Sequence, residues 1–289
     1  MSAVAILRLP LTTDLRGFIK LLQRMQVPHR VSEEAGQQVL WVPESIREDV
    51  LGLYQRFPEG DPEQQLDIPQ VATPVRVPLL RHLARCPTTS VVLLLTLAVF
   101  CVIWMGSNLQ VLGWFTFVEF HMVGENIEFG SLADSLAAGQ WWRLVTPMLI
   151  HFGILHIAMN GMWYWELGQR IELRQGAINL LGLTLLFSLV SNCAQYFFSG
   201  PRLFGGLSGV LYGLLGHCWI YQRLSPNPFY DLPRGVLVMM LVWLLLCLSG
   251  VVSALGFGSI ANAAHVGGLL VGCLTGLLGG LYSRRKLAL

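Results

Sequence analysis

Hydrophobic and polar residues follow one pattern in roughly the first 60 positions of the chain and another beyond residue 80. From Val4 to Leu9 apolar residues alternate with others as in a strand, and Thr13 or Asp14 would cap a following helix. One face of that helix collects Leu15, Phe18, Ile19, Leu22 and Met25. Val39 to Val42 predicts a second strand, and a second amphipathic helix runs from Pro43 to about Arg56. Residues 1–57 are therefore expected to form a small α+β domain, with at least the order strand, helix, strand, helix.

Beyond residue 80 the chain contains long apolar segments. A hydrocarbon core of about 30 Å needs about 20 residues of α-helix to cross it. The segments cover residues 90–107, 148–167, 177–198, 207–221, 236–255 and 261–282. Residues 81–289 are therefore predicted to be a six-transmembrane-helix bundle, an all-α membrane protein domain that follows the small α+β domain. Residues 58–80 are rich in Pro, Asp, Glu and Gln, which indicates a linker.

The composition agrees with this division. The chain is 54% hydrophobic and 12% charged, whereas soluble proteins carry about 25% charged residues. Residues 1–88 hold 20 of the 36 charged residues, so a soluble domain is expected to precede a membrane domain. A net charge of +2 offers no argument for a nucleic-acid partner. The six cysteines have neither disulfide-framework nor metal-ligand spacing, and we expect them to be small buried apolar residues.

Basic residues at the segment ends predict the orientation of the bundle. Lys and Arg gather at one set of ends, at residues 81, 85, 170, 174, 223, 234 and 284–286, whereas the opposite loops hold only Arg143 and Arg202. By the positive-inside rule both termini are cytoplasmic. The aromatic loop 108–147 then lies on the outer side, partly in the outer leaflet. The N-terminus shows no pattern of a cleaved signal peptide, so the first domain is expected to remain in the cytoplasm.

Two polar residues in the apolar segments need partners, because each is costly to bury alone. Ser208 begins the fourth segment and His265 begins the sixth, so both fall near the outer side at similar depth. An imidazole within about 3 Å of a serine hydroxyl can take its proton. The two residues therefore predict a Ser/His catalytic dyad. No Asp or Glu lies near the outer end of the sixth segment, so a triad is not expected.

His156 and Asn160 lie four positions apart on one face of the second segment, near the same side of the membrane. Their side chains and the backbone N–H of Ser208 would donate hydrogen bonds to an oxyanion. The alternative is that both residues tie helices together. We expect His151 to anchor a loop and His217 to be structural.

The fourth and sixth segments share a pattern of small residues. Small residues four positions apart allow two helices to approach closely. The sixth segment carries Ala264, Gly268, Gly272, Gly276 and Gly280, and the fourth carries Gly209, Gly213 and Gly216. The pattern predicts that these segments pack together, either as ordinary helix packing or as the contact that positions the dyad, and the two interpretations are compatible.

The candidate residues together resemble a known family. Gly-x-Ser-Gly on one helix and Ala-His-x-x-Gly on a later one are similar to the rhomboid intramembrane serine proteases. The matching residues, in chain order, are Trp142, Arg143, His151, Phe152, His156, Asn160, Ser208 and His265. The resemblance runs from about Arg85 to the C-terminus, with a weaker similarity in the N-terminal region.

This resemblance implies a serine endopeptidase that cleaves transmembrane segments of protein substrates inside the lipid bilayer, with no cofactor and no metal. It implies a multi-pass protein of a bacterial inner membrane. Supporting places fall to Tyr212, Gly206 and Gly268, and a lateral gate to Trp243 and Met159. Tyr212 would hold the ring of the catalytic histidine, although it could equally be a core aromatic residue.

Two further expectations concern water and charge. Water for deacylation would be held by polar residues of the third segment, Gln195, Ser199 and Ser191, although these residues could equally serve helix packing. Glu172 is expected to form salt bridges with Arg170 and Arg174, as a similar glutamate does in the family.

A transporter or channel would place polar residues through the full membrane depth, whereas here they cluster near one side. An inactive rhomboid-like protein that binds membrane clients would lack the serine or the histidine, and both are present.

Overall fold

The computed structural model describes residues 3–61, 83–226, 228–256 and 258–287. The chain divides into two compact units, Met1–Arg76 and Val77–Leu289, and each is described by itself. Most of the expected linker, residues 58–80, lies outside the described residues.

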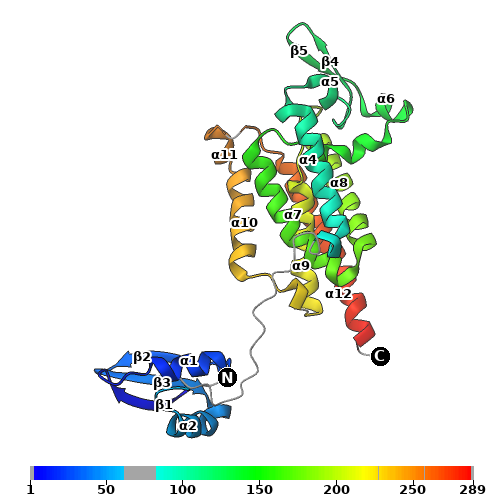
Figure 1. Ribbon diagram of the computed structural model, residues 1–289. Helices are drawn as coiled ribbons and strands as arrows, with labels where there is room; N and C mark the ends of the chain where they lie inside the picture. Colours follow the sequence, from blue (N-terminus) through cyan, green and yellow to red (C-terminus); the bar gives the residue numbers. More distant parts are fainter. Residues whose placement is uncertain (1–2, 62–82, 227, 257, 288–289) are drawn as a thin grey trace. The chain divides into compact units, whose positions relative to one another are not determined.

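The first unit is a three-stranded antiparallel sheet with two helices (Figure 1). Its elements are β1 (Ala3–Pro10), α1 (Arg16–Arg24), β2 (Arg30–Glu34), β3 (Gln37–Pro43), the 3₁₀ turn η1 (Glu44–Ile46) and α2 (Arg47–Arg56). The strands lie in the order β1-β3-β2. The core forms where the apolar face of α1, including Phe18 and Leu22, packs against Leu40 and Val42 of β3. The unit continues at least to Asp61, whose carboxylate accepts a hydrogen bond of 2.6 Å from Arg24.

The first unit contains the predicted order strand, helix, strand, helix, with one strand that the sequence pattern did not predict. The extra strand, β2, is short and polar, and it pairs with β3 across a tight turn at Ala35 and Gly36, both at positive φ. Of the two expected caps, Asp14 is the one that bonds the start of α1: its Oδ1 accepts a hydrogen bond of 2.9 Å from the backbone N–H of Arg16, the first residue of the helix, whereas Leu15 between them provides no side-chain cap.

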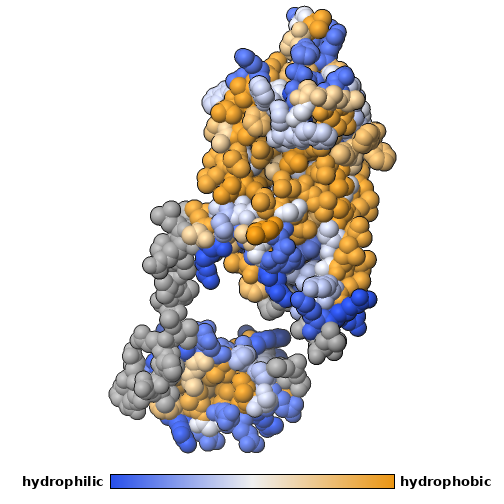
Figure 2. Space-filling model, turned by 90° about the vertical axis from the view of Figure 1, so that its right-hand side faces the viewer, coloured by the Kyte–Doolittle hydropathy of each residue, from blue (hydrophilic) through white to orange (hydrophobic). Residues whose placement is uncertain are grey.

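The second unit contains six long helices that run alongside one another (Figure 1). They are α4 (Pro87–Ile103), α7 (Ile154–Gln175), α8 (Ala177–Ser199), α9 (Ser208–Leu224), α10 (Arg234–Leu248) and α12 (Asn262–Leu287). Within the described residues three helical stretches are long and apolar enough to cross a membrane, Pro87–Gly106, Ala177–Ser199 and Asn262–Lys286, so six crossings are not confirmed. On the face that Figure 2 shows, a broad hydrophobic band crosses the middle of this unit, with hydrophilic residues toward both ends.

The bounds of two predicted segments also differ from the structure. Helix α7 begins at Ile154 rather than Met148, because residues before it form the 3₁₀ turns η3 (Trp141–Leu144) and η4 (Thr146–Leu149), and it continues beyond Leu167 to Gln175. The fifth segment is interrupted at Gly250, whose φ of 79° ends the helical path after α10, and a short helix α11 (Val251–Ala254) follows. Hydropathy alone does not detect either break, since the residues around it are apolar.

The loop between α4 and α7 is folded. It contains η2 (Trp104–Gly106), α5 (Leu109–Leu112), a hairpin of β4 (Phe120–Val123) and β5 (Asn126–Phe129), and α6 (Leu132–Ala137). The buried guanidinium of Arg143 donates a 3.0 Å hydrogen bond to the carbonyl of Thr116 and also bonds the carbonyl of Gly113 and the side chain of Gln140. The hairpin lies at the end of the unit opposite the C-terminal end of α12 (Figure 1).

Glu172 is not part of a salt bridge within the described residues, contrary to expectation. Its carboxylate is buried and accepts hydrogen bonds from the backbone N–H groups of Thr88 and Thr89 at 2.7 and 2.9 Å, and from the Thr89 hydroxyl at 2.6 Å. It therefore caps the N-terminus of α4, where backbone N–H groups lack helical partners. Arg170 pairs with Glu166 instead.

Candidate active site

Ser208 is the first residue of α9, after a loop that approaches α7 closely. Gly206 in this loop has a φ of 121° and donates a backbone hydrogen bond of 3.0 Å to the carbonyl of Pro147. A Cβ atom at Gly206 would lie 2.8 Å from Nε2 of His156 and 3.3 Å from Nδ2 of Asn160. Only glycine combines this backbone conformation with so close an approach.

His265 lies in the first turn of α12 and directly faces the serine. Its Nε2 is 2.8 Å from Oγ of Ser208, and the ring is buried. The other ring nitrogen, Nδ1, is buried and has no hydrogen-bond partner among the described residues. No carboxylate therefore orients the imidazole in the described part of the chain, and the geometry is that of a two-residue pair.

The backbones of α9 and α12 touch beside this pair. A Cβ atom on Gly268 would overlap the carbonyl of Gly209, and one on Gly272 would overlap the carbonyl of Gly213. Neither position accepts a side chain without moving a helix. The two predicted glycine patterns therefore face each other, starting at Gly209, which directly follows Ser208, and at Gly268, about one turn after His265.

Tyr212 lies one turn after Ser208 on α9. The centroid of its ring is 5.0 Å from that of His265, with the planes inclined at 45°. Its hydroxyl donates a hydrogen bond of 3.0 Å to the backbone carbonyl of Met240 in α10. The Tyr212 ring thus packs against the histidine ring, while its hydroxyl is anchored to the backbone of α10.

The two predicted oxyanion donors, His156 and Asn160 of α7, both point toward Gly206. Nδ2 of Asn160 also lies 3.0 Å from Nε2 of His151. If Nδ1 of His151 donates to the carbonyl of Leu149, 3.2 Å away, Nε2 accepts both from Asn160 and from the backbone N–H of Leu207, at 3.4 Å. His151 thereby links the loop before α7 to the loop before α9. The second amide hydrogen of Asn160 is left for another acceptor.

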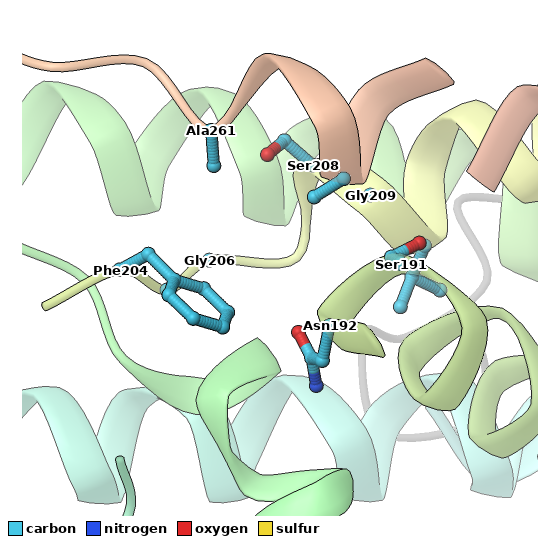
Figure 3. A pocket seen from close by; sticks show the side chains of 10 residues that line it. Ser191, Asn192, Phe204, Gly206, Ser208, Gly209 and Ala261 are labelled. Carbon is cyan, nitrogen blue, oxygen red and sulfur yellow. The ribbon is translucent and has the colours of Figure 1, made fainter. Parts of the chain in front are cut away.

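A small cavity lies behind the serine (Figure 3). Its volume is about 10 Å³, about the room that one water molecule needs. Ser191 and Asn192 of α8 approach it from one side, and Ser208 and Ala261 lie on the other. The hydroxyl of Ser191 is buried with no hydrogen-bond partner in the described structure. Gln195 is engaged with the backbone N–H of Ala264, at 3.2 Å, and with Ser199, at 3.0 Å.

The structure leaves the two predicted gate residues on the surface, with Trp243 of α10 50% exposed and Met159 of α7 46% exposed. His217 is buried and bonds Thr275 and Gln175 at 3.0 and 2.8 Å. Within the described residues no group of three or more His, Cys, Asp or Glu side chains could hold a metal ion.

Sequence reasoning assigned nothing to two asparagines near the site. Asn192 donates a hydrogen bond of 2.9 Å to the carbonyl of Leu144 and so holds the turns before α7. Asn262 donates one of 3.0 Å from α12 to the carbonyl of Cys247 at the end of α10. Their only sequence signal is that an amide in an apolar segment needs a partner.

Comparison with known proteins places this geometry in a family. The Rhomboid domain matches residues 138–282, half of the chain, and the Rhomboid N-terminal domain matches residues 1–67. Rhomboid protease GlpG of Yersinia pestis (strain Pestoides F) is 36% identical over 188 residues, 65% of this chain and 61% of the relative. Rhomboid protease GlpG of Serratia proteamaculans (strain 568) is 45% identical over 141 residues, 49% of each chain. The matched region thus spans less than two thirds of either relative. The chain belongs to the rhomboid family.

Proposed function

We propose that the chain is a serine endopeptidase that cleaves transmembrane segments of membrane proteins within the bilayer. The observation that carries the proposal is the 2.8 Å separation of Ser208 Oγ and His265 Nε2 at a buried site. The names of the relatives, each a rhomboid protease, support it.

In the proposed reaction Nε2 of His265 takes the hydroxyl proton as Ser208 Oγ attacks the carbonyl carbon of the scissile peptide. The resulting imidazolium gives that proton to the leaving amine, and an acyl-enzyme forms. Water then attacks the ester with His265 again as the base, and Ser208 is restored. Tyr212 restricts the imidazole to the orientation that this proton transfer needs.

The charge on the oxyanion would be stabilised by donors around Gly206. The N–H groups of the first turn of α9 lack helical partners, and the side chains of His156 and Asn160 face the same loop. Loss of one such donor costs about 3–4 kcal/mol of barrier in serine proteases. The cavity beside Ser191 would hold the water for deacylation, since it has the volume for one molecule and an unpaired hydroxyl.

We further propose that six helices cross a bacterial inner membrane, that both termini are cytoplasmic, and that residues 1–57 and 81–289 are separate domains. Trp243 and Met159 would line the lateral entry, since both have exposed apolar side chains.

The test is reaction of the purified protein with a fluorophosphonate, followed by mapping of the labelled residue and by an assay with a transmembrane substrate. Labelling of Ser208 in the wild type, and loss of labelling and cleavage in a folded Ser208→Ala variant, are expected. Cleavage that persists in Ser208→Ala would overturn the proposal. Absence of any labelling would favour the client-binding alternative.

A further inference from the structure

Helix α10 is attached to the two helices that carry Ser208 and His265 by a hydrogen bond from each. The Tyr212 hydroxyl on α9 donates to the carbonyl of Met240 at 3.0 Å, and Nδ2 of Asn262 on α12 donates to the carbonyl of Cys247 at 3.0 Å.

The rest of α10 packs sparsely. Of its fifteen residues only Met240, Leu244 and Cys247 are buried, whereas eleven residues of α9 are buried. The two accepting carbonyls belong to the first and last of these three residues. They are seven positions apart, two turns of helix, and so lie on the same face of α10. Movement of this face away from the bundle would break both bonds.

Both donors are immediate neighbours of the pair. Tyr212 follows Ser208 by one turn and packs its ring against His265 at 5.0 Å. Asn262 precedes His265 by three residues in the first turn of α12. Its Oδ1 is buried and has no hydrogen-bond partner among the described residues, so the bond to Cys247 is the polar anchor seen for this side chain.

We infer that Tyr212 and Asn262 are positioning residues that couple the place of α10 to the alignment of Ser208 and His265. When α10 lies against the bundle, both donors are held and the imidazole is fixed. When α10 moves aside, the Tyr212 ring and the first turn of α12 lose their anchors and the pair loses alignment. This inference rests on the proposed function and adds a link between substrate entry and chemistry.

The inference separates two measurements. A transmembrane substrate that must pass α10 should bind more readily when a bond is lost, so its KM falls. The chemical step should slow, so kcat falls, and so does the rate of inactivation by a small fluorophosphonate, which needs only an aligned pair. A residue that merely stabilises the fold would not move KM and kcat downward together.

The variants are Tyr212→Phe, Asn262→Ala and the double variant. Tyr164→Phe is the matched control for the tyrosine, because it removes a 2.8 Å hydrogen bond between α7 and α8 that does not involve α10. Ser249→Ala is the control for the asparagine, because its hydroxyl bonds the carbonyl of Leu246 at 2.8 Å at the same end of α10. For each, kcat, KM, the inactivation rate and the melting temperature are measured.

Each test variant should lower kcat and the inactivation rate about tenfold, which corresponds to ~1.4 kcal/mol, and lower KM severalfold. Because either loss releases the same helix, the double variant should lose less than the product of the single losses. Test variants that behave like their controls, or a double variant that equals the product, would overturn the inference. If Asn262→Ala does not fold, the comparison of Tyr212→Phe with Tyr164→Phe decides the inference. Failure of the proposed function would give a different result, because the wild-type protein itself would then not be labelled at Ser208.

Discussion

The hydroxyl of Ser208 and the imidazole of His265, 57 residues apart in sequence, meet at 2.8 Å because α9 and α12 touch backbone to backbone directly beside them. The contact is made by Gly209 and Gly268, which leave no room for a side chain between the helices. The spacing of the pair is therefore a property of helix packing, and the chemistry we propose depends on it.

Gly268→Ala should lower turnover strongly. The added methyl group would overlap the carbonyl of Gly209, so α12 must move and carry His265 with it. A displacement of about 1 Å can cost about a hundredfold in rate. The control is Gly182→Ala in α8, where an added Cβ meets no atom within 4 Å. Turnover and melting temperature are measured for both, and full activity in Gly268→Ala would contradict the role assigned to the contact.

His156→Ala and Asn160→Ala should each lower kcat by about a hundredfold, with a smaller change in KM, because an oxyanion donor acts mainly in the transition state. The double variant should fall by less than the product of the two, since both donors would serve one charge. Steady-state kinetics with a transmembrane substrate checks this. Changes confined to KM would reassign both residues to substrate binding.

Glu172→Gln should lower stability without a specific effect on catalysis. The amide retains one acceptor oxygen but turns its NH₂ group toward the N–H donors at the start of α4, and an unsatisfied buried hydrogen bond costs about 1–3 kcal/mol. A lower melting temperature with unchanged kcat per folded molecule is expected. The control is Glu128→Gln in the hairpin, an exposed residue. Equal melting temperatures for the two variants would show that capping of α4 by Glu172 contributes little.

A chain that begins at Val77 should insert into membranes and keep protease activity in detergent. The described hydrogen bonds around Ser208 and His265 all come from the second unit, and the first unit has its own core. Activity per folded molecule is compared with that of the full chain. A truncated protein that folds but does not cleave would show that the first unit takes part in catalysis or gating.

Residue chemistry and spacing were enough to predict the chemistry proposed for the site. Polar residues are rare in apolar helices and expensive to bury, so Ser208, His265, His156 and Asn160 could be selected from the sequence alone. The period of the small residues likewise predicted that the fourth and sixth segments pack together. The close approach of Gly268 to the carbonyl of Gly209, which leaves no room for a Cβ atom, bears this out. Both are local signals, which composition and periodicity carry directly.

Only the tertiary structure decided which partner each polar group finds. Glu172 lies between two arginines in sequence, yet it caps α4, more than 80 residues earlier. The sequence indicates only that the amide of Asn262 needs a partner. That partner is the carbonyl of Cys247 on α10, and hydropathy does not mark the end of this helix before Gly250. The short polar strand β2 was missed because it has no alternating apolar pattern of its own, and its pairing with β3 is what stabilises it. Hydrogen bonds of this kind join atoms that are distant in sequence, so their choice depends on how the helices and strands pack and not on residue type or spacing.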